Sequence, residues 1–191
     1  LLAERLTLDA SSYVGSGKTT FAIVRFGNVI GSRGSVFQIF QKQILTNNPL
    51  TVTDERMTRF IMSISDASKM ILKVTNIAKD GEIFILKMPS VKIEELAKGM
   101  LNVFKKKLPN HRITNKIKIL KSRERERFDE FLITNEEQVY CHDIGQMYKI
   151  SKIENKKPVS LNNFNSKTSK KISKKELEKI INELMDEYIT Y

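Results

Sequence analysis

The sequence is poor in the residues that build disulfides and metal centres. It contains one cysteine, Cys141, and two histidines, His111 and His142, among 191 residues. A single thiol excludes an intramolecular disulfide and suits a reducing compartment. These three side chains provide no second cluster with the ligand spacing of a zinc site, so we predict no metal centre.

Long apolar runs are missing as well. No stretch approaches the ~18 consecutive apolar residues of a membrane-spanning helix, and residues 1–5 lack the apolar core of a signal peptide. We therefore predict a cytoplasmic protein with no membrane span in this chain. The first residue is not Met, and the opening leucines look like the middle of an amphipathic helix. We accordingly expect a fragment of a longer protein.

Basic charge, by contrast, is plentiful. The formal net charge is +11, and residues 98–127 hold eleven Lys or Arg against Glu124 and Glu126. Such an excess indicates an anionic partner: nucleic acid, a membrane surface or a phosphorylated small molecule. A solvated basic face explains the same charge without a partner. Phe104 and Phe128 lie near the ends of the stretch and form no interleaved aromatic platform, so a nucleic-acid-binding module stays the alternative.

The spacing of apolar residues predicts a mixed α/β fold. Helical spacing favours helices over residues 1–12, 36–45, 65–74, 93–104 and 173–184. Short apolar runs favour strands over residues 21–30, 50–53, 60–62, 83–86, 117–120 and 147–153. The nearly continuous apolar character of residues 21–30 indicates burial on both faces, as in a parallel sheet. Ser65 is a candidate helix cap, and Ser173 with Glu176 forms a capping box.

Residues 15–20, Gly-Ser-Gly-Lys-Thr-Thr, partly match a phosphate-binding loop. The full pattern needs a further glycine where this chain has Ser12, and it needs a strand before the loop and a helix after it. Here a helix precedes and a strand follows. We therefore interpret the segment as a helix-to-strand turn.

Residues 24–36 are the strongest candidate for a ligand site. An apolar strand runs into a loop in which Gly27, Gly31 and Gly34 alternate with polar residues, and a helix follows from about Ser35. In an open α/β sheet, ligands bind outside the carboxyl ends of the strands. Glycines let the backbone approach a ligand closely, and the helix N-terminus can hold an anion.

The same loop and several later segments, taken together, resemble one protein family. The matching segments are residues 25–36, 49–54, 57–63, 81–89, 130–137, 164–166 and 172–177. In this order they resemble the nucleotide-sugar 4,6-dehydratases, polysaccharide-biosynthesis proteins of the extended short-chain dehydrogenase/reductase family. The branch they are most similar to acts on UDP-N-acetylglucosamine.

The resemblance implies that different parts of the parent protein bind the cofactor and the nucleotide sugar. Residues 1–48 would be the C-terminal part of a Rossmann-like, doubly wound NAD-binding domain, and residues 49–191 a small α+β nucleotide-sugar-binding domain with a C-terminal helix. The catalytic Tyr, Lys and acid groups would lie upstream of Leu1. NAD or NADP would be bound mainly by that missing part. We expect a homo-oligomeric parent, a UDP-sugar substrate, no nucleic-acid partner, and an inactive chain in isolation.

The resemblance also assigns roles to individual residues. Asn28 would hydrogen-bond the sugar or its diphosphate, and the backbone N–H groups of Ser35 and Val36 would meet a phosphate. Arg59 would offer its forked donors to the diphosphate, the alternative being a salt bridge to Asp54 or Glu55. The Phe26–Gly27 pair would pass beside the nicotinamide ring.

A charged turn departs from the family pattern. Arg123 and Glu126 stand where the family has an Arg and a Glu that contact the substrate, but a Pro-Gly pair between them is replaced by Glu124 and Arg125. We take both as candidate substrate-binding residues, with a charged surface turn as the alternative. A related epimerase or reductase on the same scaffold is the other enzyme that the resemblance allows.

Overall fold

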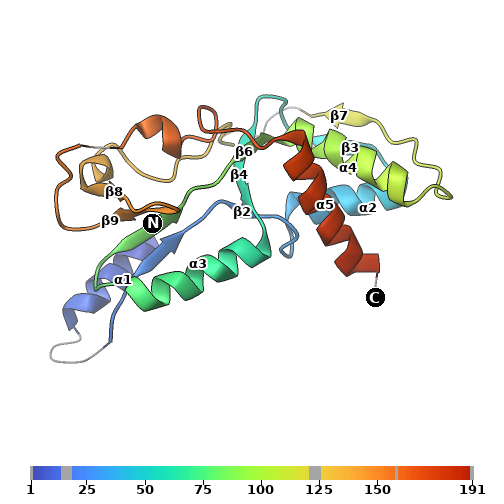
Figure 1. The fold of residues 1–191 in the computed structure, drawn as a ribbon. Helices are drawn as coiled ribbons and strands as arrows, with labels where there is room; N and C mark the ends of the chain where they lie inside the picture. Colours follow the sequence, from blue (N-terminus) through green and yellow to red (C-terminus); the bar gives the residue numbers. More distant parts are fainter. Residues whose placement is uncertain (1, 14–18, 121–125, 158, 190–191) are drawn as a thin grey trace.

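The structure is a computed structural model that describes residues 2–13, 19–120, 126–157 and 159–189 (Figure 1). Helices and strands are interspersed along the chain, as expected for a mixed α/β fold. They are α1 (Leu2–Tyr13), β1 (Ile23–Arg25), β2 (Asn28–Val29), α2 (Val36–Leu45), β3 (Leu50–Val52), β4 (Thr58–Met62), α3 (Ile64–Ile77), β5 (Ile83–Leu86), β6 (Ser90–Lys92), α4 (Ile93–Lys107), β7 (Ile117–Ile119), β8 (Cys141–Asp143), β9 (Met147–Ile150) and α5 (Lys174–Ile189). Two short 3-10 helices cover Glu137–Tyr140 and Leu161–Phe164.

The sheet with the most strands has the order β1-β5-β9-β8. β1 and β5 are parallel, whereas β9 runs antiparallel to β5 and to β8. Alternate residues of β5 point to opposite faces of the sheet. Phe84 packs with Met70 and Val74 of α3, while Ile83 and Ile85 join a cluster that also contacts Leu8 of α1. Helices therefore cover both faces of this sheet.

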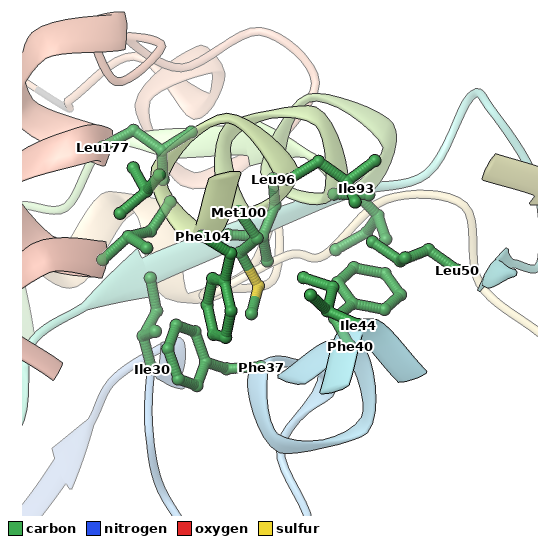
Figure 2. Packing of buried hydrophobic residues seen from close by; sticks show 14 of the residues in the cluster. Ile30, Phe37, Phe40, Ile44, Leu50, Ile93, Leu96, Met100, Phe104 and Leu177 are labelled. Atoms are coloured by element: carbon green, nitrogen blue, oxygen red, sulfur yellow. The ribbon is translucent and has the colours of Figure 1, made fainter. Parts of the chain in front are cut away.

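Two smaller sheets connect it to a helical core. The first has the order β2-β4-β6, and the second pairs β3 with β7. The largest apolar cluster lies where α2, α4 and α5 meet β3, and its fully buried members include Phe37, Phe40, Ile44, Met100 and Phe104 (Figure 2). α5 packs on α4 at Gly99, where an added Cβ would lie 3.3 Å from Leu177 and Ile181.

The α/β class is confirmed, and the differences from expectation are local. The strand expected over residues 21–30 is broken at Phe26–Gly27 into β1 and β2. The cap of α3 is Ser63, whose hydroxyl accepts the backbone N–H of Asp66, and not Ser65. The capping box of α5 is present, because Ser173 and Glu176 exchange backbone-to-side-chain hydrogen bonds.

The expected domain division at residue 48 does not follow the strand pairing. β1 lies before residue 48 and β5 after it, yet Ile23, Val24 and Arg25 pair directly with Ile83, Phe84 and Ile85. The two units thus share one sheet, and the boundary stays a prediction. Residues 15–18 of the partial phosphate-loop match lie outside the described residues.

Candidate functional site

The candidate site is built where β1 passes into β2. Gly27 stands at the break, and an added Cβ there would lie 2.4 Å from the Cβ of Phe60 and 2.7 Å from its carbonyl oxygen. The missing side chain thus lets β2 lie against β4, where Asn28 pairs with Ile61. Gly27 was expected to make room for nicotinamide, and the structure gives it this packing role in addition.

A first cleft of about 370 Å³ opens beside β2 and the start of α2. Five of the residues expected to bind substrate line it together: Asn28, Ser35, Val36, Arg59 and Glu126. They come from separate segments that the fold brings to one place. Further lining residues include Ser32, Arg33, Gly34, Thr53, Met57 and Ile93.

The start of α2 supplies the polar end of this first cleft. Val36 is the first helical residue, so its N–H has no intrahelical acceptor. Ser35 is the cap residue, and its own N–H donates to the carbonyl of Ser32 at 3.0 Å. Of the two N–H groups expected to meet a phosphate, only that of Val36 is therefore available to a ligand. The Ser35 hydroxyl oxygen is buried and has no hydrogen-bond partner among the described residues. This end of the cleft is suited to an anion.

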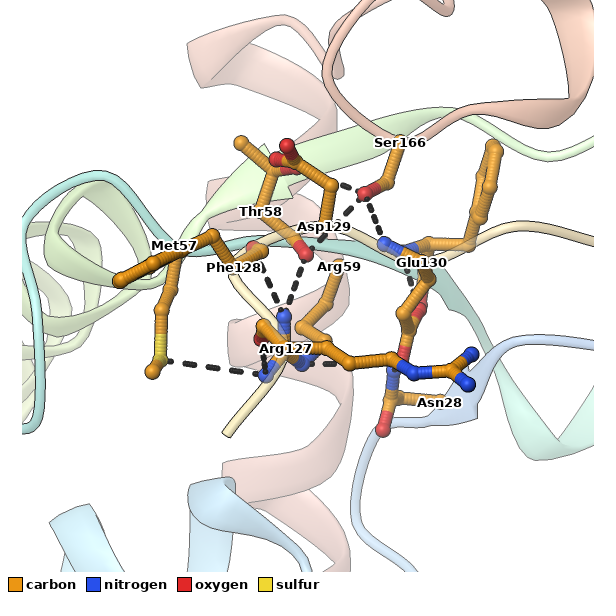
Figure 3. Close-up of polar contacts among 10 residues, drawn as sticks. Asn28, Met57, Thr58, Arg59, Arg127, Phe128, Asp129, Glu130 and Ser166 are labelled. Atoms are coloured by element: carbon orange, nitrogen blue, oxygen red, sulfur yellow. Dashed lines mark hydrogen bonds and ion pairs between the residues drawn. The ribbon is translucent and has the colours of Figure 1, made fainter. Parts of the chain in front are cut away.

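Arg59 projects from β4 toward the segment 127–130 (Figure 3). Its Nη1 donates to the carbonyls of Thr58 (2.8 Å) and Phe128 (3.0 Å), and its Nη2 donates to the carbonyl of Arg127 (2.9 Å). Its Nε lies 3.6 Å from Glu130 Oε1. Arg59 thus offers an anion its charge, whereas a forked contact with a diphosphate requires some of these hydrogen bonds to break.

The expected alternative for Arg59, a salt bridge to Asp54 or Glu55, is wrong. Arg59 pairs with Glu130, and Asp54 accepts two side-chain hydrogen bonds from Arg56 at 2.8 and 2.9 Å. Those bonds from Arg56 lower the pKa of Asp54 to about 2.

A second cleft of about 430 Å³ adjoins the first. It is lined by Phe26, Gly27, Arg127, Phe131 and Leu132, and also by Asn28, Arg59 and Glu130. Asn28 and Arg59 therefore belong to both clefts. The two residues expected on the cofactor side, Phe26 and Gly27, lie in the second cleft and not in the first.

The charged turn is only partly described. Arg123 lies outside the described residues, as do Glu124 and Arg125. Glu126 lines the first cleft, and its role as a substrate-binding residue stays a prediction.

Arg25 fixes the strand that leads into the site. Its guanidinium pairs with Glu4 of α1 at 2.8 Å and with Glu137 at 2.7 Å, and it also donates to the carbonyl of Leu132. Burial by itself lowers the pKa of Arg25, but the hydrogen bonds to Glu137 and Glu4 outweigh it and raise the pKa above its ordinary value. Burial by itself raises the pKa of Glu137. The hydrogen bonds from Arg25 and Thr134 outweigh that effect and bring the pKa below its usual range.

Metal-binding clusters and membrane-spanning helices are both absent from the described part of the chain. No group of three or more His, Cys, Asp or Glu side chains is placed to hold a metal ion among the described residues. Within the same residues, every helix is too short or too polar to cross a bilayer. Cys141 is buried, and its pKa is raised to about 11, chiefly by that burial.

Two residues of the site were not assigned from the sequence. Arg33 lines the first cleft beside the start of α2. Its place in the glycine-rich loop was a usable signal. Glu130 contacts both Asn28 and Arg59, and only its position in a matching segment marked it beforehand.

Comparison with known proteins identifies the family of this chain. A family model described as polysaccharide biosynthesis protein matches residues 1–152. An uncharacterized membrane protein of Methanocaldococcus jannaschii is 41% identical over 189 residues, which cover 96% of this chain and 56% of that protein. The UDP-glucose 4-epimerase of Rickettsia bellii is 37% identical over 149 residues, which cover 78% of this chain and 42% of the epimerase.

A solved structure shares the fold over nearly the whole chain. Pen from Bacillus thuringiensis is 36% identical with a TM-score of 0.82, and the match covers 95% of this chain and 55% of that one. The chain thus spans about half the length of the relatives that it matches. On the family model and these relatives, the chain belongs to the polysaccharide biosynthesis protein family, in which its matched relatives include nucleotide-sugar epimerases.

Proposed function

We propose that this chain is the nucleotide-sugar side of an NAD(P)-dependent UDP-N-acetylglucosamine 4,6-dehydratase, a lyase of polysaccharide biosynthesis. The observation that carries the proposal is the first cleft. Asn28, Ser35, Val36, Arg59 and Glu126, which the resemblance assigns to substrate, all line this one cavity. The catalytic Tyr, Lys and acid groups belong to the part of the parent upstream of this chain.

The polar end of the first cleft suits the diphosphate. The Val36 N–H lies at a helix N-terminus, the Ser35 hydroxyl has no described partner, and Arg33 adds a cation at the same wall. A diphosphate accepts hydrogen bonds and carries negative charge, so all three groups favour it. Arg59, which lines the same cleft, also contributes its charge.

The second cleft suits the sugar and the nicotinamide end of the cofactor. Phe26 is 37% exposed and lines that cleft next to Gly27, so an aromatic face is available beside the Asn28 wall. These residues fit a planar ring. When bound, NAD or NADP supplies hydride acceptance from the sugar C4 and hydride return to C6. The residues of this chain bind and orient the sugar so that one molecule of water is lost across C5 and C6.

The proposal is tested with the intact protein that contains this chain. Incubation with UDP-N-acetylglucosamine and either dinucleotide should give a product lighter by one water, with NMR signals of a C6 methyl group and a hydrated or free C4 ketone. Substitution of Arg33 by Gln should weaken substrate binding without loss of folded structure. An intact, folded protein that binds no UDP-sugar would contradict the proposal.

An epimerase is the second candidate, and the 37% identity to the Rickettsia bellii UDP-glucose 4-epimerase favours it. Epimerisation and dehydration both begin with oxidation at C4, so the first cleft serves either. The products separate the two. An epimerase returns hydride to C4 and gives an isomer of unchanged mass, whereas a dehydratase returns hydride to C6 after water has left.

A further inference from the structure

Glu130 joins the two clefts through an unusually full set of hydrogen bonds. Its Oε1 accepts from Asn28 Nδ2 at 2.9 Å and lies 3.6 Å from Arg59 Nε. Its Oε2 accepts from the backbone N–H of Phe60 at 3.0 Å and lies 3.1 Å from Asn28 Nδ2. Both carboxylate oxygens therefore face donors (Figure 3).

The main chain of Glu130 is held as firmly as its side chain. Its N–H donates to the hydroxyl of Ser166 at 2.8 Å, and its carbonyl accepts the N–H of Ser166 at 2.9 Å. Ser166 is fully buried and donates in turn to the carbonyl of Thr58 at 3.1 Å. Glu130 is thus anchored to β4, the strand that carries Arg59.

This anchoring decides which atom of Asn28 can meet a ligand. Asn28 Nδ2 has two hydrogens, and it donates to the Glu130 carboxylate and to the carbonyl of Phe60 at 3.2 Å. With both hydrogens engaged, the amide offers a ligand its oxygen, which Figure 3 shows on the side away from Glu130. A side-chain oxygen accepts from hydroxyl or N–H groups and repels phosphate oxygens.

We propose that Glu130 is a positioning residue of the nucleotide-sugar site: it engages the amide N–H of Asn28, which is then not donated to the diphosphate, so that the amide oxygen accepts a hydrogen bond from the sugar. The inference rests on the proposed function. It narrows the role of Asn28 from contact with the sugar or the diphosphate to recognition of a hydroxyl or amide N–H on the sugar. UDP alone lacks that sugar donor, so it serves as the matched ligand.

The test measures affinities of the intact protein for UDP-N-acetylglucosamine and for UDP. In Glu130→Gln, either orientation of the new amide places its NH₂ group against a donor, which is Asn28, Arg59 or the Phe60 N–H. We expect UDP-N-acetylglucosamine to bind about three- to tenfold more weakly, since a hydrogen bond to a held group is lost. UDP affinity should not fall, because neutralising the carboxylate beside Arg59 does not weaken a site for an anion. Glu136→Gln, which changes an exposed acid in the same segment, should leave both affinities unchanged.

A rescue experiment separates positioning from a general structural effect. Asn28→Asp places two carboxylates together and should weaken sugar binding. In the double variant Asn28→Asp/Glu130→Gln, the new amide at position 130 can donate to the new carboxylate at position 28, so part of the UDP-N-acetylglucosamine affinity should return. Losses that simply add, or an equal loss of UDP and UDP-N-acetylglucosamine in Glu130→Gln, would overturn the proposal.

A failure of the proposed function is recognised separately. A wild-type protein that binds neither ligand contradicts the nucleotide-sugar assignment. The contact is then followed without ligand, from the side-chain amide NMR signals of Asn28, identified by their loss in Asn28→Ala. A shift of those signals in Glu130→Gln supports the positioning role, and unchanged signals overturn it.

Discussion

Gly27 and Gly34 stand in one loop but are required for different physical reasons. The φ angle of Gly27 is not in the left-handed region, and the constraint is the close approach of Phe60. Gly34 has a φ of 75° and nothing within 4 Å of an added Cβ. The sequence marks both as special, but it cannot say that the first is a packing contact, because the partner lies on another strand.

Alanine at each glycine should separate the two effects. Gly27→Ala should lower the free energy of unfolding by about 2–3 kcal/mol, because the Cβ clashes with the backbone of β4. Gly34→Ala should cost about 1–2 kcal/mol through its left-handed backbone alone. Denaturant unfolding of the two variants measures both values. A Gly27→Ala variant as stable as the wild type would contradict the close approach.

The candidate site shows what residue patterns can and cannot reveal. Motif order was enough to place Asn28, Ser35, Val36 and Arg59 near one another, and one cleft contains them. The hydrogen-bond partners of these residues could not be predicted from the sequence. Arg59 and Asn28 donate to segment 127–130, which lies far away in the sequence. Partner choice depends on the tertiary fold.

At the scale of elements, Arg25 ties α1 and β1 to the segment that follows Leu132. Its two carboxylate partners, Glu4 and Glu137, lie 21 and 112 residues away. In the sequence Arg25 was only a charge that interrupts an apolar run. Its side chain is 16% exposed, so the pairing compensates a charge that the strand has taken largely out of water.

This ion-pair group predicts a specific response to acid. The pKa of Glu137 is lowered from an ordinary 4.5, so its stabilising contribution is fully present above about pH 4.5 and is lost as the pH falls through the lower folded-state pKa. Glu137→Gln should reduce stability at neutral pH by roughly 2 kcal/mol, a hydrogen bond to a charged partner. It should also flatten the acid limb of the stability curve.

The measurement is the midpoint of urea unfolding between pH 3 and pH 7, roughly the range over which carboxylates titrate. Glu136→Gln is the control, since Glu136 is exposed in the same turn. Equal pH dependence in Glu137→Gln and the wild type would show that Glu137 does not carry the effect.

Elements with an apolar pattern of their own were predictable, and short strands without one were not. α2 and α4 lie close to their expected bounds because helical spacing defines them, and β5 does so because it is an unbroken apolar run. β6 and β8 have three residues each and exist because neighbouring strands pair with them. Such strands have little signal of their own, which is why Ser90–Lys92 and Cys141–Asp143 went unpredicted.

The whole molecule has an excess of positive charge, and its basic side chains lie in different surroundings. Arg33 lines the first cleft at the N-terminus of α2, where an anion fits. Lys105, Lys106 and Lys107 lie in the last turn of α4, where cations complement the helix dipole, and Lys107 is paired with Asp186. These three lysines of the basic stretch therefore have a structural explanation that needs no nucleic acid.

Two single-charge variants should tell these surroundings apart. In the intact protein, Arg33→Gln should weaken UDP binding about tenfold, because a charge-assisted hydrogen bond to the diphosphate is worth about 1.5–3 kcal/mol. Lys106→Gln removes the same charge from an exposed position of α4 and should leave UDP affinity unchanged. The basic-module alternative predicts a different result. Lys106→Gln would lower the affinity for random nucleic acid, and that binding would fall steeply with added salt. Arg33→Gln would then weaken UDP binding no more than Lys106→Gln does.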